Sequence, residues 1–112
     1  MALTINPYDV NMYLAMNRFQ VNEGREEDFI EIWRKRDSFL DEVPGFKSFN
    51  LLQGKTEDGI TLFTSHSVWE SKAAFEDWTH SEAFRKAHAG AGKTAEGIYA
   101  GPPKLELFDS VL

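Results

Sequence analysis

The 112-residue chain contains no cysteine, which excludes several kinds of site at once. A disulfide framework, a thiolate nucleophile and a cysteine-based metal centre all require that side chain. Basic residues are also scarce, because 12 Lys and Arg stand against 18 Asp and Glu, for a net charge of −6 at pH 7. Since the phosphates of nucleic acids demand a basic surface, we expect no nucleic-acid partner.

Long apolar runs are absent as well. No segment approaches the roughly 20 apolar residues of a membrane-spanning helix. The first ten residues, MALTINPYDV, lack the basic and apolar regions of a signal peptide. We therefore expect a cytoplasmic location and no membrane partner.

Aromatic residues, in contrast, are abundant. Nine Phe and three Trp suffice for a core, a subunit interface or a pocket for a flat ligand. The length fits one domain, and a domain of this size buries only about two-thirds of its unfolded surface, so a partner subunit would add burial. We predict an N-terminal arm over residues 1–11, which show no periodicity, and a single domain over residues 12–112.

The apolar pattern predicts a mixed α and β domain. Alternation predicts strands over residues 12–21, 46–54, 60–69 and 104–112. Helical spacing predicts helices over residues 26–43, 72–79 and 82–89. Asp58-Gly59 indicates a hairpin between the second and third strands. The order β-α-β-β-α-β predicts an α+β, ferredoxin-like split fold with a four-stranded antiparallel sheet and helices on one face.

Such a sheet leaves its other face bare. If strand pairing keeps register, we expect seven large apolar residues on that bare face: Leu14, Met16, Phe49, Leu51, Phe63, Trp69 and Phe108. An apolar surface of this size predicts burial against a second copy of the chain.

The segment GAGKT, residues 90–94, has the ending of a phosphate-binding loop. The full motif G-x-x-x-x-G-K-[ST] requires glycine at position 87, where the chain has Ala87. The segment also follows a predicted helix, whereas a phosphate loop leaves a strand and opens a helix. We therefore interpret it as a glycine helix end followed by a connecting loop over about residues 89–103.

Three residues are candidates for a ligand site. Trp78 and His88 flank a break in the helical pattern, where Ser81 can cap a new helix, and this break allows both side chains to reach one cavity. Asn17 stands on the otherwise apolar face of the first strand, where a buried amide needs a partner. Each has a structural alternative: Trp78 as a core residue, His88 as a histidine at a helix end, and Asn17 satisfied by a neighbour.

These residues lie in segments that resemble a known family. MNRF, VPGF and VWESKAAFEDWTHSEAFRKAH resemble the IsdG-type heme-degrading monooxygenases of the antibiotic biosynthesis monooxygenase superfamily, which are dimeric α/β barrels. The resemblance spans about residues 12–111 and implies a heme site made by Asn17, Trp78 and His88. It implies His88 as the axial iron ligand, Asn17 on the opposite face and Trp78 against the ring. Trp33 and Arg36 match the helix that borders the heme, although Trp33 stands where relatives tend to carry phenylalanine.

The resemblance implies a heme-degrading monooxygenase that opens the porphyrin with O2 to a linear tetrapyrrole and releases iron for acquisition. Heme would be both substrate and oxygen activator. Electrons would come from an external reductase or a small reductant, because the chain has no flavin or iron–sulfur motif. The expected assembly is a homodimer. Two alternatives stay open: a non-catalytic heme carrier, and a cofactor-free monooxygenase acting on quinols or polyketide aromatics.

Overall fold

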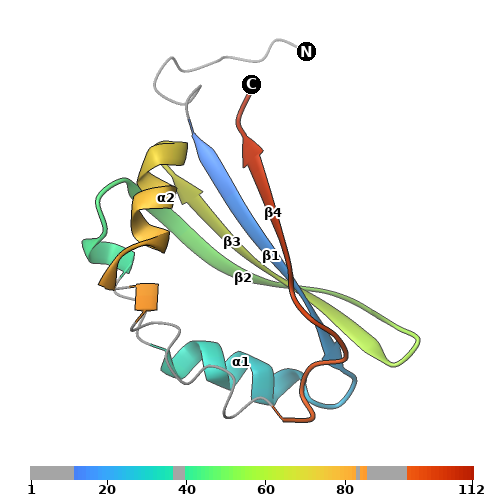
Figure 1. Ribbon diagram of the computed structural model, residues 1–112. Helices are drawn as coiled ribbons and strands as arrows, with labels where there is room; N and C mark the ends of the chain where they lie inside the picture. Colours follow the sequence, from blue (N-terminus) through green and yellow to red (C-terminus); the bar gives the residue numbers. More distant parts are fainter. Residues whose placement is uncertain (1–11, 37–39, 83, 86–95) are drawn as a thin grey trace.

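A four-stranded antiparallel sheet with strand order β2-β3-β1-β4 forms the centre of the molecule (Figure 1). The computed structural model describes residues 12–36, 40–82, 84–85 and 96–112. The strands are β1 (Tyr13–Asn22), β2 (Phe46–Glu57), β3 (Ile60–Trp69) and β4 (Lys104–Asp109). The helices are α1 (Glu26–Lys35) and α2 (Lys72–Thr79), with a short 3₁₀ helix at Leu40–Glu42. The predicted ferredoxin-like order of elements is confirmed.

The hairpin between β2 and β3 turns on Asp58 and Gly59, as predicted. Their φ angles are 55° and 80°. A two-residue turn with positive φ at both positions matches the right-handed twist of paired strands, and glycine adopts it without a Cβ clash. This turn joins β2 to β3, which pair antiparallel in the sheet.

Both helices pack on the same face of the sheet, here called the covered face. Phe29 of α1 packs with Phe19 and Phe63, while Phe75 of α2 packs with Tyr13 and Trp69. Tyr13 pairs with Trp69 across β1 and β3, and Phe19 pairs with Phe63. Directly paired residues project from the same side of a sheet, so all four strand residues belong to the covered face.

This register corrects the predicted bare face. Phe63 and Trp69 are buried in the core at 1% and 0% exposure, and Phe49 and Leu51 pack against the same clusters. These four residues therefore lie beneath the helices. The prediction placed two strands one residue out of phase with β1, and a shift of one residue moves every side chain to the opposite face.

The face away from the helices, here called the open face, is less apolar than expected. Of the predicted residues it retains Leu14, Met16 and Phe108. It also carries an ion pair between Arg18 and Glu106, 2.6 Å apart. Phe108 is 45% exposed.

The first helix is shorter than predicted. It ends at Lys35, because Arg36 has an extended backbone with φ −75° and ψ 124°. The chain next enters the 3₁₀ helix, where Leu40 is buried in the cluster beside α2 rather than in the one beside α1. The long apolar stripe of the sequence thus belongs to two elements that pack at different ends of the sheet. Phe39 lies outside the described residues.

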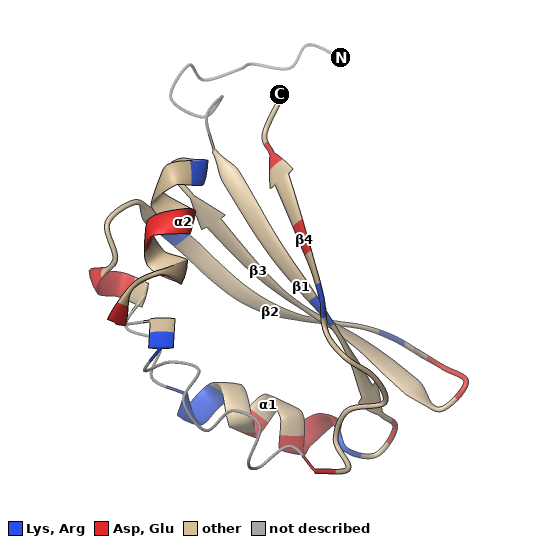
Figure 2. Ribbon diagram, viewed as in Figure 1, with Lys and Arg blue, Asp and Glu red and all other residues tan. Residues whose placement is uncertain are grey.

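The charges of α1 suit its dipole. Its first turn carries three carboxylates and its last turn carries Arg34 and Lys35 (Figure 2). Negative charge near a helix N-terminus and positive charge near its C-terminus are both stabilising. The acidic first turn was predicted.

The caps of the later helices also follow the prediction. The Ser71 hydroxyl accepts a hydrogen bond from the Ala74 N–H at 3.1 Å and begins α2. The Ser81 hydroxyl accepts one from the Phe84 N–H at 3.1 Å and begins a new helical turn. The rest of the helix predicted to residue 89 lies outside the described residues. None of the helices described is long and apolar enough to cross a membrane.

Candidate functional site

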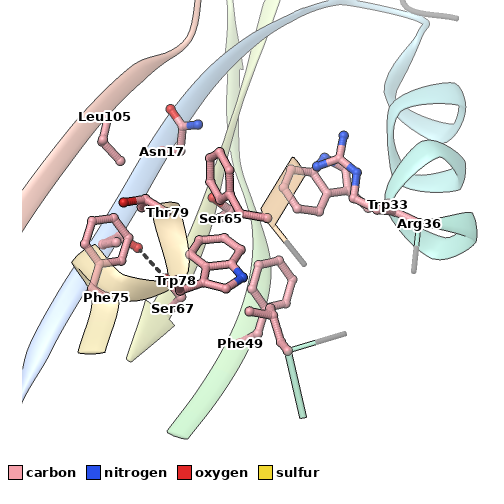
Figure 3. Close-up of a pocket in the computed structure, with 13 residues that line it drawn as sticks. Asn17, Trp33, Arg36, Phe49, Ser65, Ser67, Phe75, Trp78, Thr79 and Leu105 are labelled. Atoms are coloured by element: carbon pink, nitrogen blue, oxygen red, sulfur yellow. Dashed lines mark hydrogen bonds between the residues drawn. The ribbon is translucent and has the colours of Figure 1, made fainter. Parts of the chain in front are cut away.

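A cavity of about 410 Å³ lies between the covered face and the elements that pack on it (Figure 3). It is lined by Ala15, Asn17, Trp33, Arg36, Leu40, Phe49, Ser65, Ser67, Phe75, Trp78, Thr79, Phe84 and Leu105. Most of this lining is aromatic or aliphatic, with a few polar groups among it. Cavities of this size and character are typical of small-molecule sites.

Side-chain size along the strands explains why the cavity is there. On the covered face of β1, Tyr13 and Phe19 stand toward the ends, with Ala15 and Asn17 between them. On β3, Phe63 and Trp69 flank two serines in the same way. Large residues fill the space under each helix and small residues leave a gap between. We call Ala15, Asn17, Ser65 and Ser67 the middle of the covered face.

Asn17 lies in the middle of the covered face, on the strand between β3 and β4. It pairs with Ser65 on β3 and with Leu105 on β4. Its Oδ1 atom is buried and has no hydrogen-bond partner among the described residues. A buried polar atom without a partner costs about 1–3 kcal/mol, so the site favours a ligand or water that supplies one.

Trp78 forms a wall of the cavity. Its ring lies 5.1 Å from that of Trp69 and meets the edge of Phe84 at 4.8 Å, measured between centroids. Phe75 adds a third aromatic contact at 6.2 Å. Trp78 is therefore both a packed residue and a cavity residue, and its neighbours hold the indole in one orientation.

Trp33 and Arg36 border the cavity from the end of α1. The Trp33 ring stacks on Phe49 with centroids 5.5 Å apart and planes 24° from parallel. The guanidinium carbon of Arg36 lies 4.4 Å from the centroid of the Trp33 ring, a cation–π contact. The Trp33 Nε1 atom is buried without a hydrogen-bond partner in the described part of the chain.

Arg36 is a partly buried cation. Burial lowers the pKa of Arg36, and its interaction with Tyr99 opposes that shift. Burial also raises the pKa of the Tyr99 hydroxyl, against the pull of the nearby guanidinium. Arginine nevertheless stays charged at neutral pH. No ion pair joins Arg36 to a carboxylate among the residues that the structure places, so its charge suits an anionic group on a ligand.

Four of the five predicted site residues thus line one cavity: Asn17, Trp33, Arg36 and Trp78. The fifth, His88, lies outside the described residues. Its role as iron ligand, and the roles of the other four, stay predictions. Within the described part of the chain, no group of three or more His, Cys, Asp or Glu could hold a metal ion.

Sequence reasoning missed several lining residues. Phe49 was assigned to the wrong face, and Ser65 and Ser67 were not considered. Strand alternation gives the spacing of these residues but not their phase relative to Asn17.

Sequence reasoning also missed a core residue, Ile98, because its segment was predicted as loop. Its side chain is buried at 1% exposure. A backbone bridge between Tyr99 and Val21 holds that segment against the sheet.

The sequence pattern of the antibiotic biosynthesis monooxygenase family matches residues 12–90. The chain belongs to this family. A curated relative, the heme-degrading monooxygenase of Shouchella clausii (strain KSM-K16), is 29% identical over 98 residues, which cover 88% of this chain and 89% of that protein.

Solved structures share the fold. A Bacillus cereus structure assigned to the same family has a TM-score of 0.69 at 21% identity, with 88% of this chain and 92% of that chain covered. A mutant form of SnoaB from Streptomyces nogalater, a cofactor-independent oxygenase, has a TM-score of 0.64 at 23% identity, with 88% and 91% covered. The family is one of monooxygenases, and these relatives differ in whether heme takes part.

Proposed function

We propose that the protein is a heme-degrading monooxygenase, which binds heme and opens the porphyrin with O2 and external electrons to a linear tetrapyrrole, releasing iron. The observation that supports this most is the meeting of Asn17 and Trp78, from β1 and α2, at one aromatic cavity. Trp33 and Arg36 line the same cavity. The activity named for the Shouchella clausii relative supports the same proposal.

The lining suits a heme in three respects. Flat aromatic walls, with Trp33, Phe49 and Trp78 among them, match a flat macrocycle. Arg36, which takes part in none of the ion pairs among the described residues, suits the propionates at the heme edge. Asn17 provides an amide on the sheet side. Bound heme would supply oxygen activation and would itself be the substrate.

Each protein residue then has a defined task. Asn17 would donate a hydrogen bond from its amide and orient O2. Trp78, held by three aromatic neighbours, would pack against the bound ring and disfavour a planar porphyrin. His88 would hold the iron, since a neutral imidazole is a good iron ligand. In the sequence, His88 follows the cavity residue Phe84 by four positions. If the predicted helix over residues 82–89 forms, this spacing would place both side chains on one helix face.

The proposal includes a homodimer and an external electron donor, either a reductase or a small reductant. Leu105 and Leu107 on the edge strand β4 are 54% and 43% exposed, and Phe108 on the open face is 45% exposed. A second copy that covers β4 and the open face would bury this apolar surface.

Aerobic turnover tests the proposal. The purified protein is loaded with hemin, reduced with ascorbate in air, and its pigment is analysed by mass spectrometry. We expect the Soret band to bleach and a linear tetrapyrrole to form. Heme that stays bound and intact would instead identify a carrier.

A second candidate is a cofactor-free monooxygenase acting on quinols or polyketide aromatics. The fold shared with SnoaB favours it, at a TM-score of 0.64. The cavity would then bind a smaller aromatic substrate without heme. Oxygen uptake with a quinol, in a protein that causes no saturable change in the hemin spectrum, would select this alternative.

A further inference from the structure

We propose that the hydroxyl of Ser65 and the amide of Asn17 together hold one ordered water molecule on the floor of the cavity. Ser65 is then a positioning residue, which places a hydrogen-bond donor beside the substrate. The binding of this water is a property of the protein alone. Its effect on heme rests on the proposed function.

The two side chains are neighbours across the sheet. Asn17 and Ser65 are direct partners in the pairing of β1 with β3, and both line the cavity. Side chains of such a pair have Cβ atoms about 4.5–5.5 Å apart. Their polar tips can therefore contact the same small molecule.

The Ser65 side chain is largely buried, at 9% exposure, and its hydroxyl has no hydrogen-bond partner among the described residues. The other cavity hydroxyls are engaged. Ser67 donates to the Ala15 carbonyl at 3.3 Å and accepts from Trp69 Nε1 at 2.9 Å. Thr79 donates to the Glu76 carbonyl at 2.7 Å.

Water is the partner that fits this place. A buried water needs space and two to four polar contacts. The cavity supplies the space, and Asn17 and Ser65 supply two contacts. In Figure 3 the amide oxygen of Asn17 lies on the side of Leu105 and the amide nitrogen on the opposite side. The neighbouring floor residues Ala15, Leu105 and Phe49 have no polar side-chain atoms that could take its place.

With heme bound, this water would lie between the sheet and the substrate. Asn17 and Ser65 would fix its position, and its free O–H would point at whatever occupies the open face of the ring. The chain would thereby present a hydrogen-bond donor that Asn17 alone does not provide.

Two substitutions of similar shape isolate the hydroxyl. Ser65→Thr keeps it and Ser65→Val removes it. High-resolution crystals grown without hemin should show a water within hydrogen-bond distance of both side chains in the wild type and in Ser65→Thr. The water should be lost in Ser65→Val. A wild-type cavity without this water, or a water that stays in Ser65→Val, overturns the proposal.

The infrared C–O stretch of carbon monoxide bound to the reduced heme complex reports donors beside the substrate. Ser65→Val should move this band to higher frequency and slow turnover about two- to tenfold, the size expected from one hydrogen bond. Ser65→Thr should restore both. Thr64→Val is the control, because Thr64 pairs with Arg18 and projects from the open face.

The outcomes separate the two proposals. If hemin does not bind the wild type, the proposed function fails, and the crystals still decide whether Ser65 holds water. If hemin binds and Ser65→Val leaves the band and the rate unchanged, the water has no place beside the substrate and the inference is wrong.

Discussion

The ends and the middle of the covered face differ in whether their buried polar groups have hydrogen-bond partners. At the α1 end, Thr61 is 0% exposed, and its hydroxyl donates to Glu26 at 2.9 Å and lies 2.6 Å from the Thr56 hydroxyl. In the middle, Asn17 has a buried oxygen without a partner among the described residues. The ends are therefore built for stability, and the middle gives up stability to leave groups available for a ligand.

Truncating a buried side chain at the α1 end of the covered face should have the largest effect on stability. Phe29 is 0% exposed and lies 4.7 Å from Phe63, between ring centroids. Phe29→Ala should lower the free energy of unfolding by about 3–5 kcal/mol, through lost burial and the cavity left behind. Urea unfolding followed by circular dichroism measures it. Val111→Ala, after the end of β4, is the control and should cost far less, because Val111 is 82% exposed. Equal costs for the two would remove the distinction between buried end and exposed surface.

Replacing the central amide should separate function from stability. Asn17→Leu keeps the side-chain volume but removes the hydrogen-bonding groups. Hemin turnover should fall about ten- to a hundredfold, because a positioned donor is lost. The free energy of unfolding should stay the same or rise by about 1 kcal/mol, because a buried oxygen without a partner disappears. A variant that loses stability instead would show that Asn17 is satisfied in the folded protein and serves its packing.

Arg36 tests whether the border of the cavity binds the carboxylates of heme. Arg36→Gln should weaken hemin binding about tenfold, the size of one charge-assisted hydrogen bond. The dimethyl ester of hemin, which lacks the carboxylates, should bind wild type and variant alike. Arg34→Gln is the matched control two residues earlier, in the last turn of α1, where the exposed Arg34 pairs with Glu31. Loss of ester binding in Arg36→Gln would point to packing against Trp33 rather than to charge.

The smallest effect is expected at Glu26. Its own backbone N–H, followed by the Thr61 hydroxyl, lowers the pKa of the Glu26 carboxyl from its usual value of 4.5. A lowered pKa in the folded state gives stability that is present above the unfolded value and is lost as pH falls through the folded one. Thermal unfolding of Glu26→Gln should therefore depend less on pH below about 4.5 than that of the wild type. A variant that keeps the wild-type pH dependence would show that the Glu26 carboxyl does not contribute this stability.

The order of elements could be predicted from the sequence because each boundary has a local cause. Asp58-Gly59 determines the hairpin, and Ser71 and Ser81 begin their helices by hydrogen bonds within one turn. Asn17 and Trp78 each gave only a weak signal, as an amide on an apolar strand face and a tryptophan before a helix break, and the resemblance to a known family identified them as site candidates.

The phase of the strands could not be predicted. Alternation fixes a period of two but not which set of residues meets the helices, and that choice depends on pairing between distant segments. For this reason Phe49 was assigned to the open face and Ser65 was overlooked. The end of α1 at Lys35 was missed for a related reason, since one apolar stripe serves two separate packing sites.

A crystal structure of the protein grown with hemin tests the central claim most directly. We predict one porphyrin per chain in the middle of the covered face, with the amide of Asn17 on one side of the ring, Trp78 against it and His88 on the iron. Hemin found only on the open face or at the protein surface, with the middle filled by solvent, would contradict the account.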